Sequence, residues 1–432
     1  MTRTLIKLGG IVISSQETYD GPSYILINDD GNIEQVGFGD YPGDARATAI
    51  VDRRHAVAIP GLVNSHGHAA MTLLRGIGDD LPLKAWLNDR VLPTEEKLTS
   101  DAVYWGTLLA AWEMIGSGTT CFTDMYMFMH DAAKAVSESG MRAVLSWGMV
   151  GFDEQGQERA IRNSREFVGR WHGGADGRIT TTLGPHAPYT CPPDFLRRIA
   201  ELSGELRVPV QIHLSETRVE VENSMRDWGM SPIAHVADCG LLDGPVLAAH
   251  CVHVSPEDID LMAAKGVRVA HNPQSNLKLA SGIAPIVAMH EAGLTIGLGT
   301  DGAASNNNLD MLEELRLAAT LHKGVLQQAT AIPAPVAFQM ATEDSAKAVF
   351  LPPGHGTLRT GSSADLVLLD RRSPHFIPSH SLLSNIVYAA GEGDVLDVYV
   401  QGVPVLQNKE CTTIDTERVT YEVNRIKDQL VG

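Results

Sequence analysis

The chain has 432 residues, of which 44% are hydrophobic and 20% are charged, and this balance excludes a disordered or fibrous protein. A chain of this length exceeds the size at which a single core stops growing, so we expect one large domain and a smaller one. The formal net charge of −18 repels phosphate backbones and anionic lipid surfaces, which argues against nucleic acid or a membrane as a partner.

The N-terminal residues MTRTLIKLGGIVISS are typical of a short alternating strand followed by a turn. They lack the long apolar stretch of a signal peptide or a membrane span. The five cysteines are widely spaced and include no CxxC pair, so neither a disulfide framework nor a thiolate zinc cluster is expected. We therefore expect a cytoplasmic protein.

Eight short apolar runs alternate with longer segments of helical periodicity between residues 58 and 354. This alternation predicts an α/β fold in which eight parallel strands close a (β/α)₈ TIM barrel. In SPEDIDLMAAKG the helix boundaries are explicit, with Ser255 as cap, Pro256 at the first position, Asp258 at the capping-box position and Gly266 at the end. The runs are AIPGLVNSHGH, GTTCFTDM, MRAVLSWG, ITTTLGPH, VPVQIHL, PVLAAHCV, GVRVAHNP and LTIGLGTDG.

The two ends of the chain differ from this middle part. Residues 1–57 and about 355–410 contain short strands and turns, such as NIEQVGFG, GTLRTGSSADLVLLD and VLDVYVQGVPV. We expect residues 1–57 and 355–432 to form one small β-sandwich domain beside a barrel of residues 58–354. The final segment, IDTERVTYEVNRIKDQLVG, has helical spacing and is expected to pack on the outside.

Polar side chains stand at the end of nearly every apolar run. The C-terminal ends of barrel strands form one face, so residues that are distant in the sequence are expected to converge there. A single histidine at a strand end is usually a hydrogen-bonded structural residue, but eight polar residues together favour a functional site. They are His66, His68, Asp124, His186, His213, His250, His271 and Asp301.

The segment His66-Gly67-His68 carries the strongest local signal. Residues two apart in an extended strand point to the same side, so both imidazoles can reach one metal ion, and Gly67 lets the backbone approach closely. His213 on the fifth run and Asp301 on the eighth complete a set of three histidines and an aspartate. This set suits Zn²⁺ with an open position for water, and Fe²⁺ or Mn²⁺ suits it as well.

Two further residues are placed to move protons beside such a metal. Glu216 follows His213 by three residues, where its carboxyl can face a metal-bound water without binding the metal itself; the alternative is a solvated loop glutamate. His250 in AAHCVH either polarises the water or hydrogen-bonds from outside the coordination sphere, and the sequence leaves both roles open.

Six segments at these strand ends occur in a recognisable order: PGLVNSHGHAAMTLLRG, GPHAPY, IHLSE, AAHCVH, HNPQSNLKL and GTDGAASNN. Together they make essentially the whole chain resemble the amidohydrolase superfamily, and within it the 5′-methylthioadenosine/S-adenosylhomocysteine deaminases. The resemblance implies hydrolytic deamination of adenosine-type nucleosides to their inosine analogues, with release of ammonia. It also implies a small-molecule substrate and favours a homo-oligomer.

The resemblance implies that one zinc ion is bound by His66, His68, His213 and Asp301. No carbamylated lysine is implied, because the fourth run ends in His186, which is implied to lie near the substrate.

For the reaction itself, the resemblance implies that Glu216 is the general acid/base that protonates the purine ring nitrogen. His250 and Asp301 are implied to handle the attacking hydroxide. Glu95 in LPTE matches the residue that binds the ribose hydroxyls, although the sequence alone favours an ordinary acid at a helix start.

The 5′ end of the substrate is where this chain departs from the family pattern. Members that accept S-adenosylhomocysteine grip its carboxylate with two arginines, and here Arg159 matches one position while Trp147 occupies the other. Tryptophan cannot form the bidentate pair that guanidinium offers a carboxylate, but it packs well against apolar groups. We hypothesise a preference for nucleosides with a small or apolar 5′ group; the alternative is that Trp147 is a core residue facing a helix.

Two other functions stay open at the level of sequence. Chlorotriazine hydrolases, guanine deaminases and pterin deaminases resemble the chain in the metal motifs, and Glu95 discriminates against them because a free base has no ribose to bind. A non-catalytic metal- or ligand-binding barrel is the other alternative. It predicts the loss of a catalytic group, whereas all the expected groups are present.

Overall fold

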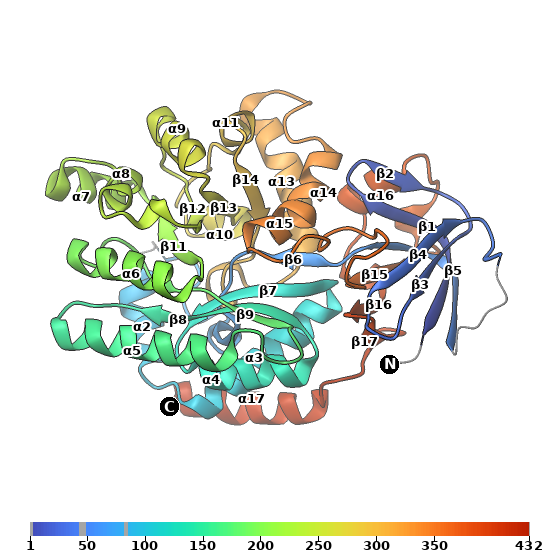
Figure 1. The fold of residues 1–432 in the computed structure, drawn as a ribbon, viewed down its shortest axis with the longest axis horizontal. Coiled ribbons are helices and arrows are strands. Elements are labelled where there is room, and N and C mark those ends of the chain that lie inside the picture. The colour runs from blue at the N-terminus through green and yellow to red at the C-terminus, as the bar shows by residue number, and fades with distance from the viewer. Residues whose placement is uncertain (1–2, 43–48, 82–84, 432) are drawn as a thin grey trace.

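The computed structural model describes residues 3–42, 49–81 and 85–431, so residues 1–2 and 43–48 of the predicted N-terminal segment and residue 432 lie outside the described ranges. Both ends of the chain join in one nine-stranded sheet, on the right in Figure 1, which confirms that they pair. The order is β18-β17-β16-β15-β5-β1-β3-β4, with β2 paired to β1. The strands are β1 (Thr4–Ser14), β2 (Glu17–Tyr19), β3 (Ser23–Ile27), β4 (Ile33–Phe38), β5 (Ala49–Pro60), β15 (Leu366–Asp370), β16 (Val395–Val400), β17 (Val403–Gln407) and β18 (Glu410–Cys411).

Strand β5 connects this sheet to the barrel. It pairs with β15 as far as Pro60, three residues beyond the predicted boundary at residue 57, because the apolar residues 56–59 are fully buried in the sheet. The chain then enters the barrel directly in β6 (Leu62–Asn64). The short connection therefore ties the first barrel strand to the small sheet.

The eight predicted apolar runs supply the strands of the barrel. They form two parallel sheets, β6 to β10 and β11 to β14, which meet at a bridge between Leu183 and Val210. The ring closes where the Ser65 amide donates to the carbonyl of Leu298 at 2.8 Å. After β6, the strands are β7 (Thr119–Tyr126), β8 (Arg142–Met149), β9 (Ile179–Thr181), β10 (Gly184–Pro185), β11 (Val210–Leu214), β12 (Val246–His250), β13 (Arg268–His271) and β14 (Thr295–Leu298).

Helices surround the barrel strands (Figure 1). The capping box of α9 is confirmed: the Ser255 hydroxyl accepts from the Asp258 amide, and the Asp258 carboxylate accepts from the Ser255 amide. The terminal helix α17 lies against α3 on the outside, as predicted. The helices are α2 (Leu92–Glu95), α3 (Ser100–Gly116), α4 (Met129–Ser139), α5 (Glu154–Trp171), α6 (Pro193–Leu206), α7 (Arg218–Trp228), α8 (Pro232–Asp238), α9 (Pro256–Lys265), α10 (Pro273–Lys278), α11 (Ile286–Glu291), α12 (Ala303–Asn306), α13 (Met311–Leu326), α14 (Ala334–Ala341), α15 (Glu343–Ala348), α16 (Leu382–Tyr388) and α17 (Thr416–Val431).

The described residues also contain five shorter helical turns, namely η1 (Ala69–Leu74), η2 (Trp86–Val91), η3 (Leu241–Asp243), η4 (Pro374–Phe376) and η5 (Glu392–Asp394). None of the helices in the described part of the chain combines the length and the apolar character needed to cross a membrane.

A buried ion pair joins the barrel to the small sheet. Arg142, at the start of β8, donates from Nε to the Asp365 carboxylate at 3.1 Å, and both side chains are 7% exposed. The same carboxylate accepts from the Gln401 amide at 2.7 Å. Although burial opposes ionisation, Arg142 holds the pKa of Asp365 below its ordinary value.

Replacing Asp365 with alanine is expected to destabilise the protein by about 3–5 kcal/mol, because the Arg142 charge is then left buried without a partner. Chemical denaturation of the two proteins measures the difference. The matched control is Glu205→Ala, which removes an exposed partner of Arg165 and should change stability little. Equal effects of the two substitutions would contradict the prediction.

Candidate active site

The four predicted metal ligands lie together at the C-terminal ends of β6, β11 and β14. His66, His68 and His213 each offer a ring nitrogen, and these nitrogens lie within 4.8 Å of one another. Asp301 joins them, with its Oδ1 atom 3.3 Å from Nε2 of His68 and 3.7 Å from Nε2 of His66. Residues from three separate strands therefore converge on one point, and we call these four side chains the His/Asp cluster.

The hydrogen bonds of the cluster leave ring nitrogens available to a cation. His68 donates from Nδ1 to the Met125 carbonyl at 2.8 Å, and His213 donates from Nδ1 to the His186 carbonyl at 2.7 Å. In each ring this leaves the lone pair of Nε2 facing the cluster. Nε2 of His66 is buried and has no hydrogen-bond partner. Such an atom is costly unless something binds it, so the cluster fits a divalent metal ion.

Burial also favours the neutral, ligating form of two of these rings. It lowers the pKa of His66 and of His213 well below the ordinary value for histidine. His68 differs: burial opposes its protonation, but the hydrogen bond to Asp301 raises its pKa to about 9. The Asp301 carboxylate therefore favours a positive charge beside it, which either a proton on His68 or a bound cation can supply.

Asp301 is held by three donors. Its Oδ2 atom accepts from the hydroxyls of Ser275 at 2.7 Å and Ser305 at 2.9 Å, and its Oδ1 atom accepts from the Gly302 amide at 2.8 Å. The residue itself has a φ of +62°, in the left-handed region that non-glycine residues seldom adopt. Backbone strain of this kind is often found at functional sites, where the surroundings hold it in place.

Glu216 and His250 lie beside the His/Asp cluster. The Oε2 atom of Glu216 is 4.0 Å from Nε2 of His250, and its Oε1 atom accepts from the Ser281 hydroxyl at 3.2 Å. His250 donates from Nδ1 to the side-chain oxygen of Asn276 at 2.8 Å, and a ring nitrogen of His250 lies within 4.8 Å of ligand atoms of His66 and Asp301. A carboxyl group and an imidazole therefore face the same space as the candidate ligands.

Glu95 reaches this site from α2. Its Oε1 atom accepts from the Tyr126 hydroxyl at 2.5 Å, and the Tyr126 ring lies 6.2 Å from the ring of His68, centroid to centroid. Burial raises the pKa of Glu95 above its ordinary value. The half-buried carboxylate is thus connected to the cluster through one aromatic side chain.

The remaining predicted substrate residues are arranged differently. His186 is half-buried, with its ring centroid 5.0 Å from that of His213, so it lines the site. Arg159 is exposed on α5. Trp147 is half-buried, and its ring packs against His130 at 5.7 Å and Phe167 at 6.4 Å, both on the surrounding helices. These contacts are those of a side chain that faces the surrounding helices, and its role toward a substrate stays a prediction.

Two polar residues at strand ends belong to neither group of candidate metal ligands. The Asp124 carboxylate accepts from the Ala69 amide at 3.2 Å, and burial raises its pKa to about 6. Nε2 of His271 lies 3.3 Å from Nε2 of His322 on α13. Both are buried structural contacts, which is the ordinary role of a polar residue at a strand end.

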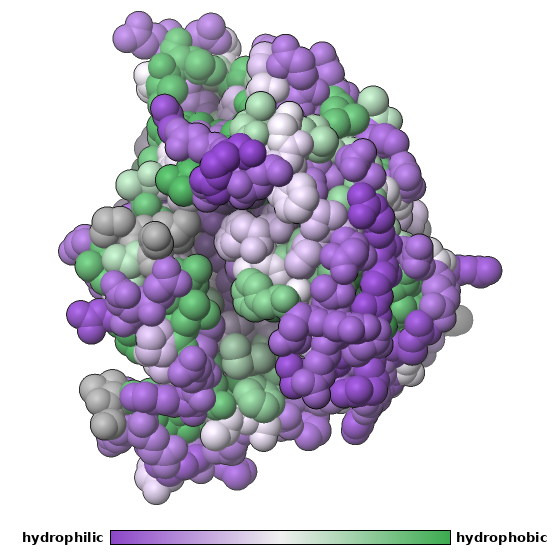
Figure 2. Space-filling model, turned by 90° about the vertical axis from the view of Figure 1, so that its left-hand side faces the viewer, coloured by the Kyte–Doolittle hydropathy of each residue, from purple (hydrophilic) through white to green (hydrophobic). Residues whose placement is uncertain are grey.

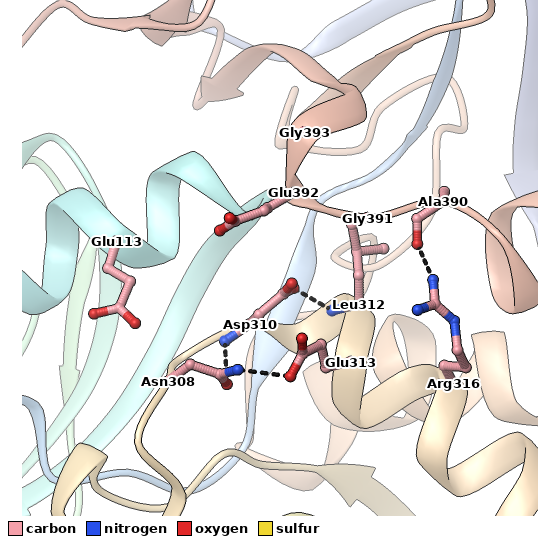
Figure 3. A pocket seen from close by; sticks show the side chains of 10 residues that line it. All are labelled: Glu113, Asn308, Asp310, Leu312, Glu313, Arg316, Ala390, Gly391, Glu392 and Gly393. Carbon is pink, nitrogen blue, oxygen red and sulfur yellow. Dashed lines mark hydrogen bonds between the residues drawn. The ribbon is translucent and has the colours of Figure 1, made fainter. Parts of the chain in front are cut away.

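The surface is hollowed on the side where α2, α6, α7 and α8 lie in Figure 1, and both apolar and polar residues surround the hollow (Figure 2). A separate cavity of about 410 Å³ lies between α3, the start of α13 and the turn at residues 390–393 (Figure 3). Four of its ten lining residues are acidic, and burial raises the pKa of one of them, Asp310, to about 6. Arg316 donates to the carbonyl of Ala390 across it. None of its lining residues belongs to the His/Asp cluster.

The sequence did not point to the residues that support the site from behind. Ser275 and Ser305 hold Asp301, Ser281 holds Glu216, and Tyr126 holds Glu95. The serines lie in or next to the motifs HNPQSNLKL and GTDGAASNN, so their proximity to a ligand segment was a usable signal. Tyr126 carried a weaker one, since it follows Asp124 by two residues at a strand end.

Comparison with known proteins gives a consistent result. The model of the amidohydrolase family matches residues 57–405. A curated relative from Desulforamulus reducens, named 5-methylthioadenosine/S-adenosylhomocysteine deaminase, is 47% identical over 100% of both chains. A relative of the same name from Desulforudis audaxviator is 50% identical over 91% of each chain. The solved structure of an adenosine deaminase from Xanthomonas campestris with bound zinc superposes with a TM-score of 0.93 at 34% identity, covering 99% of this chain and 98% of that one.

Proposed function

The chain belongs to the amidohydrolase family, and from this premise we propose that it is a zinc-dependent deaminase that converts adenosine-type nucleosides into their inosine analogues. The proposal rests on the position of Glu216 and His250 beside the His/Asp cluster, where Oε2 of Glu216 lies 4.0 Å from Nε2 of His250. Hydrolytic deamination requires a metal, a proton carrier and a second polar group in one place. The substrates that we propose for this chain are 5′-methylthioadenosine, 5′-deoxyadenosine and adenosine.

The metal is held by His66, His68, His213 and Asp301. Three imidazoles and one carboxylate suit zinc, and the relative from Xanthomonas campestris binds zinc. When bound, the ion supplies Lewis-acid activation of water. A cytoplasmic location and a homo-oligomeric state accompany this proposal as predictions from the sequence.

The residues of the chain carry the protons. Water adds its oxygen to the purine carbon that bears the amino group, and the bond from that carbon to nitrogen then breaks to release ammonia. Glu216 takes one proton from water and delivers it to the adjacent ring nitrogen, then takes the proton left on the added oxygen and passes it to the departing amino group. His250 and Asp301 accept hydrogen bonds or protons from the attacking oxygen as its charge changes.

The sugar is recognised by Glu95. A carboxylate accepts hydrogen bonds from two vicinal hydroxyls well, and Tyr126 fixes this carboxylate from the other side. The half-buried carboxylate of Glu95 is partly withdrawn from water and held in a fixed orientation, so hydrogen bonds from the ribose hydroxyls would stabilise it.

Replacing Glu95 with glutamine is expected to lower kcat/KM for adenosine by about 10- to 100-fold, because a hydrogen bond to a charged group contributes about 1.5–3 kcal/mol. Steady-state kinetics on 2′,3′-dideoxyadenosine provide the control, since that substrate lacks the two vicinal hydroxyls and the two proteins should treat it alike. Unchanged turnover of adenosine by the variant would favour a free heterocycle as substrate.

One experiment tests the reaction and the substrate class together. The zinc-loaded protein is incubated with 5′-methylthioadenosine, 5′-deoxyadenosine, adenosine, S-adenosylhomocysteine, adenine and guanine, while ammonia release and the absorbance change to inosine are followed. We expect the nucleosides to be deaminated, and 5′-methylthioadenosine to be preferred over S-adenosylhomocysteine. Ammonia from the free bases alone would overturn the proposal. Comparable kcat/KM values for 5′-methylthioadenosine and S-adenosylhomocysteine would overturn the preference.

A further inference from the structure

The turn that carries Glu216 is held in an unusual way. Glu216 follows β11 after Ser215, whose φ of +52° lies in the left-handed region. The hydroxyl of Ser215 is buried and has no hydrogen-bond partner, and its carbonyl accepts from the His253 amide at 2.8 Å. Because such a conformation is disfavoured for serine, other contacts must hold the turn in place.

Glu220 provides those contacts. Its Oε1 atom accepts from the Ser215 amide at 2.9 Å, and its Oε2 atom accepts from the Glu216 amide at 2.8 Å. Glu220 is only 9% exposed, so its carboxylate is withdrawn from water. A buried carboxylate with two backbone donors makes strong, directional hydrogen bonds, and these fix the orientation of both peptide groups.

This arrangement differs from ordinary helix capping. Thr217 caps α7 and accepts from the Glu220 amide, and a glutamate three residues after such a cap usually bonds back to the amide of the cap itself. The Asp258 carboxylate does this to Ser255 in α9. The Glu220 carboxylate instead reaches the two residues that precede the cap. It therefore serves the turn before the helix.

The same turn is linked to the opposite wall of the site. Ser281 donates to Oε1 of Glu216, and the Ser281 carbonyl accepts from Nε2 of His253 at 2.7 Å. His253 also donates its amide to Ser215, so the turn and the Ser281 loop are joined through one residue. The backbone of Glu216 is held by Glu220 and its carboxyl by Ser281.

We infer that Glu220 is a positioning residue, which fixes the turn after β11 so that the Glu216 carboxyl stands at the right distance from a substrate held at the His/Asp cluster. The inference rests on the proposed role of Glu216. His213 lies on the same strand end three residues before Glu216, so the turn sets the position of the proton carrier relative to one metal ligand. A displacement of a reacting group by about 1 Å can lower a rate about 100-fold.

The test compares Glu220→Gln with Glu222→Gln, an exposed neighbour on the same helix. Glutamine has one carbonyl oxygen, so it accepts from one amide and turns its NH₂ group toward the other. With zinc-loaded protein and 5′-methylthioadenosine, E220Q is expected to lower kcat about 10- to 100-fold. KM, zinc content and melting temperature should stay near those of E222Q, which should match the wild type.

A second comparison separates positioning from general stability. In the Glu216→Gln background, E220Q should lower kcat little further, because the group that it positions is already disabled. Glu220→Asp keeps the charge but is too short to reach both amides, so it should give an intermediate kcat, and it carries the same comparison if E220Q fails to fold.

The outcomes are distinct. If E220Q matches E222Q while E216Q is impaired, or if E220Q lowers kcat equally in both backgrounds, the inference is overturned and the proposed function stands. A loss of kcat that merely follows a loss of zinc or of melting temperature overturns it as well. Wild-type kcat in E216Q overturns the proposed role of Glu216, and the inference falls with it.

Discussion

Glu216→Gln is expected to lower kcat for 5′-methylthioadenosine by about 10²- to 10⁴-fold, which is the usual contribution of a general acid or base. Glutamine has nearly the shape of glutamate and still accepts from Ser281, so the turn should stay in place. What is lost is the ability to carry one proton from water to the ring nitrogen and the other to the departing amino group. Stopped assays of ammonia release measure the effect, and metal analysis should show unchanged zinc.

A change of leaving group sharpens this test. Chloride departs without a proton, whereas ammonia must receive one. The loss caused by E216Q should therefore be smaller for 6-chloropurine riboside than for the aminopurine nucleoside. An equal loss for both substrates would mean that Glu216 holds the substrate or the site in shape and does not carry the proton to the leaving group.

His66→Ala is expected to abolish the deaminase activity and most of the bound metal. Nε2 of His66 is a buried nitrogen without a hydrogen-bond partner, so no other contact competes for it. Removing a residue that only orients a ligand lowers metal affinity by about 10- to 100-fold, and removal of a ligand itself should cost more than that. Competition with a chromogenic chelator gives the affinity, and elemental analysis gives the stoichiometry.

The matched control is His271→Asn, which alters another buried histidine, at the end of β13. His271 contacts His322 and belongs to neither group of candidate ligands. This variant should retain its zinc even if it is less stable. If it loses metal to the same extent as H66A, the effect of H66A is one of folding, and the His/Asp cluster loses its support as the metal centre.

The architecture was largely predictable because it depends on patterns that recur along the chain. Each apolar run became a barrel strand, and the capping box in α9 formed as its four residues suggested. Burial of an apolar strand and satisfaction of helix ends are local requirements, so short windows of sequence reveal them. The exact end of the small sheet was less predictable, since β5 and the barrel share one uninterrupted apolar stretch.

The ligands were predictable for a related reason. His66 and His68 are two apart on one strand, and a barrel brings the ends of all its strands to one face. Trp147 shows the limit of such reasoning. Its position at a strand end is plain from the sequence, but the direction of its ring depends on the space that His130 and Phe167 leave beside it.

By itself, then, the sequence determined the barrel, the pairing of the two chain ends and the histidines and aspartate at the strand ends, because these follow from periodicity and spacing along the chain. Only the tertiary structure decided which side chains stand behind them. Glu220 reaches back past the cap of its own helix, and Ser281 meets Glu216 from a loop 65 residues away. The Ser281 contact joins segments that meet only after folding, and the Glu220 contacts depend on the left-handed turn at Ser215, so no local pattern of residues specifies either of them.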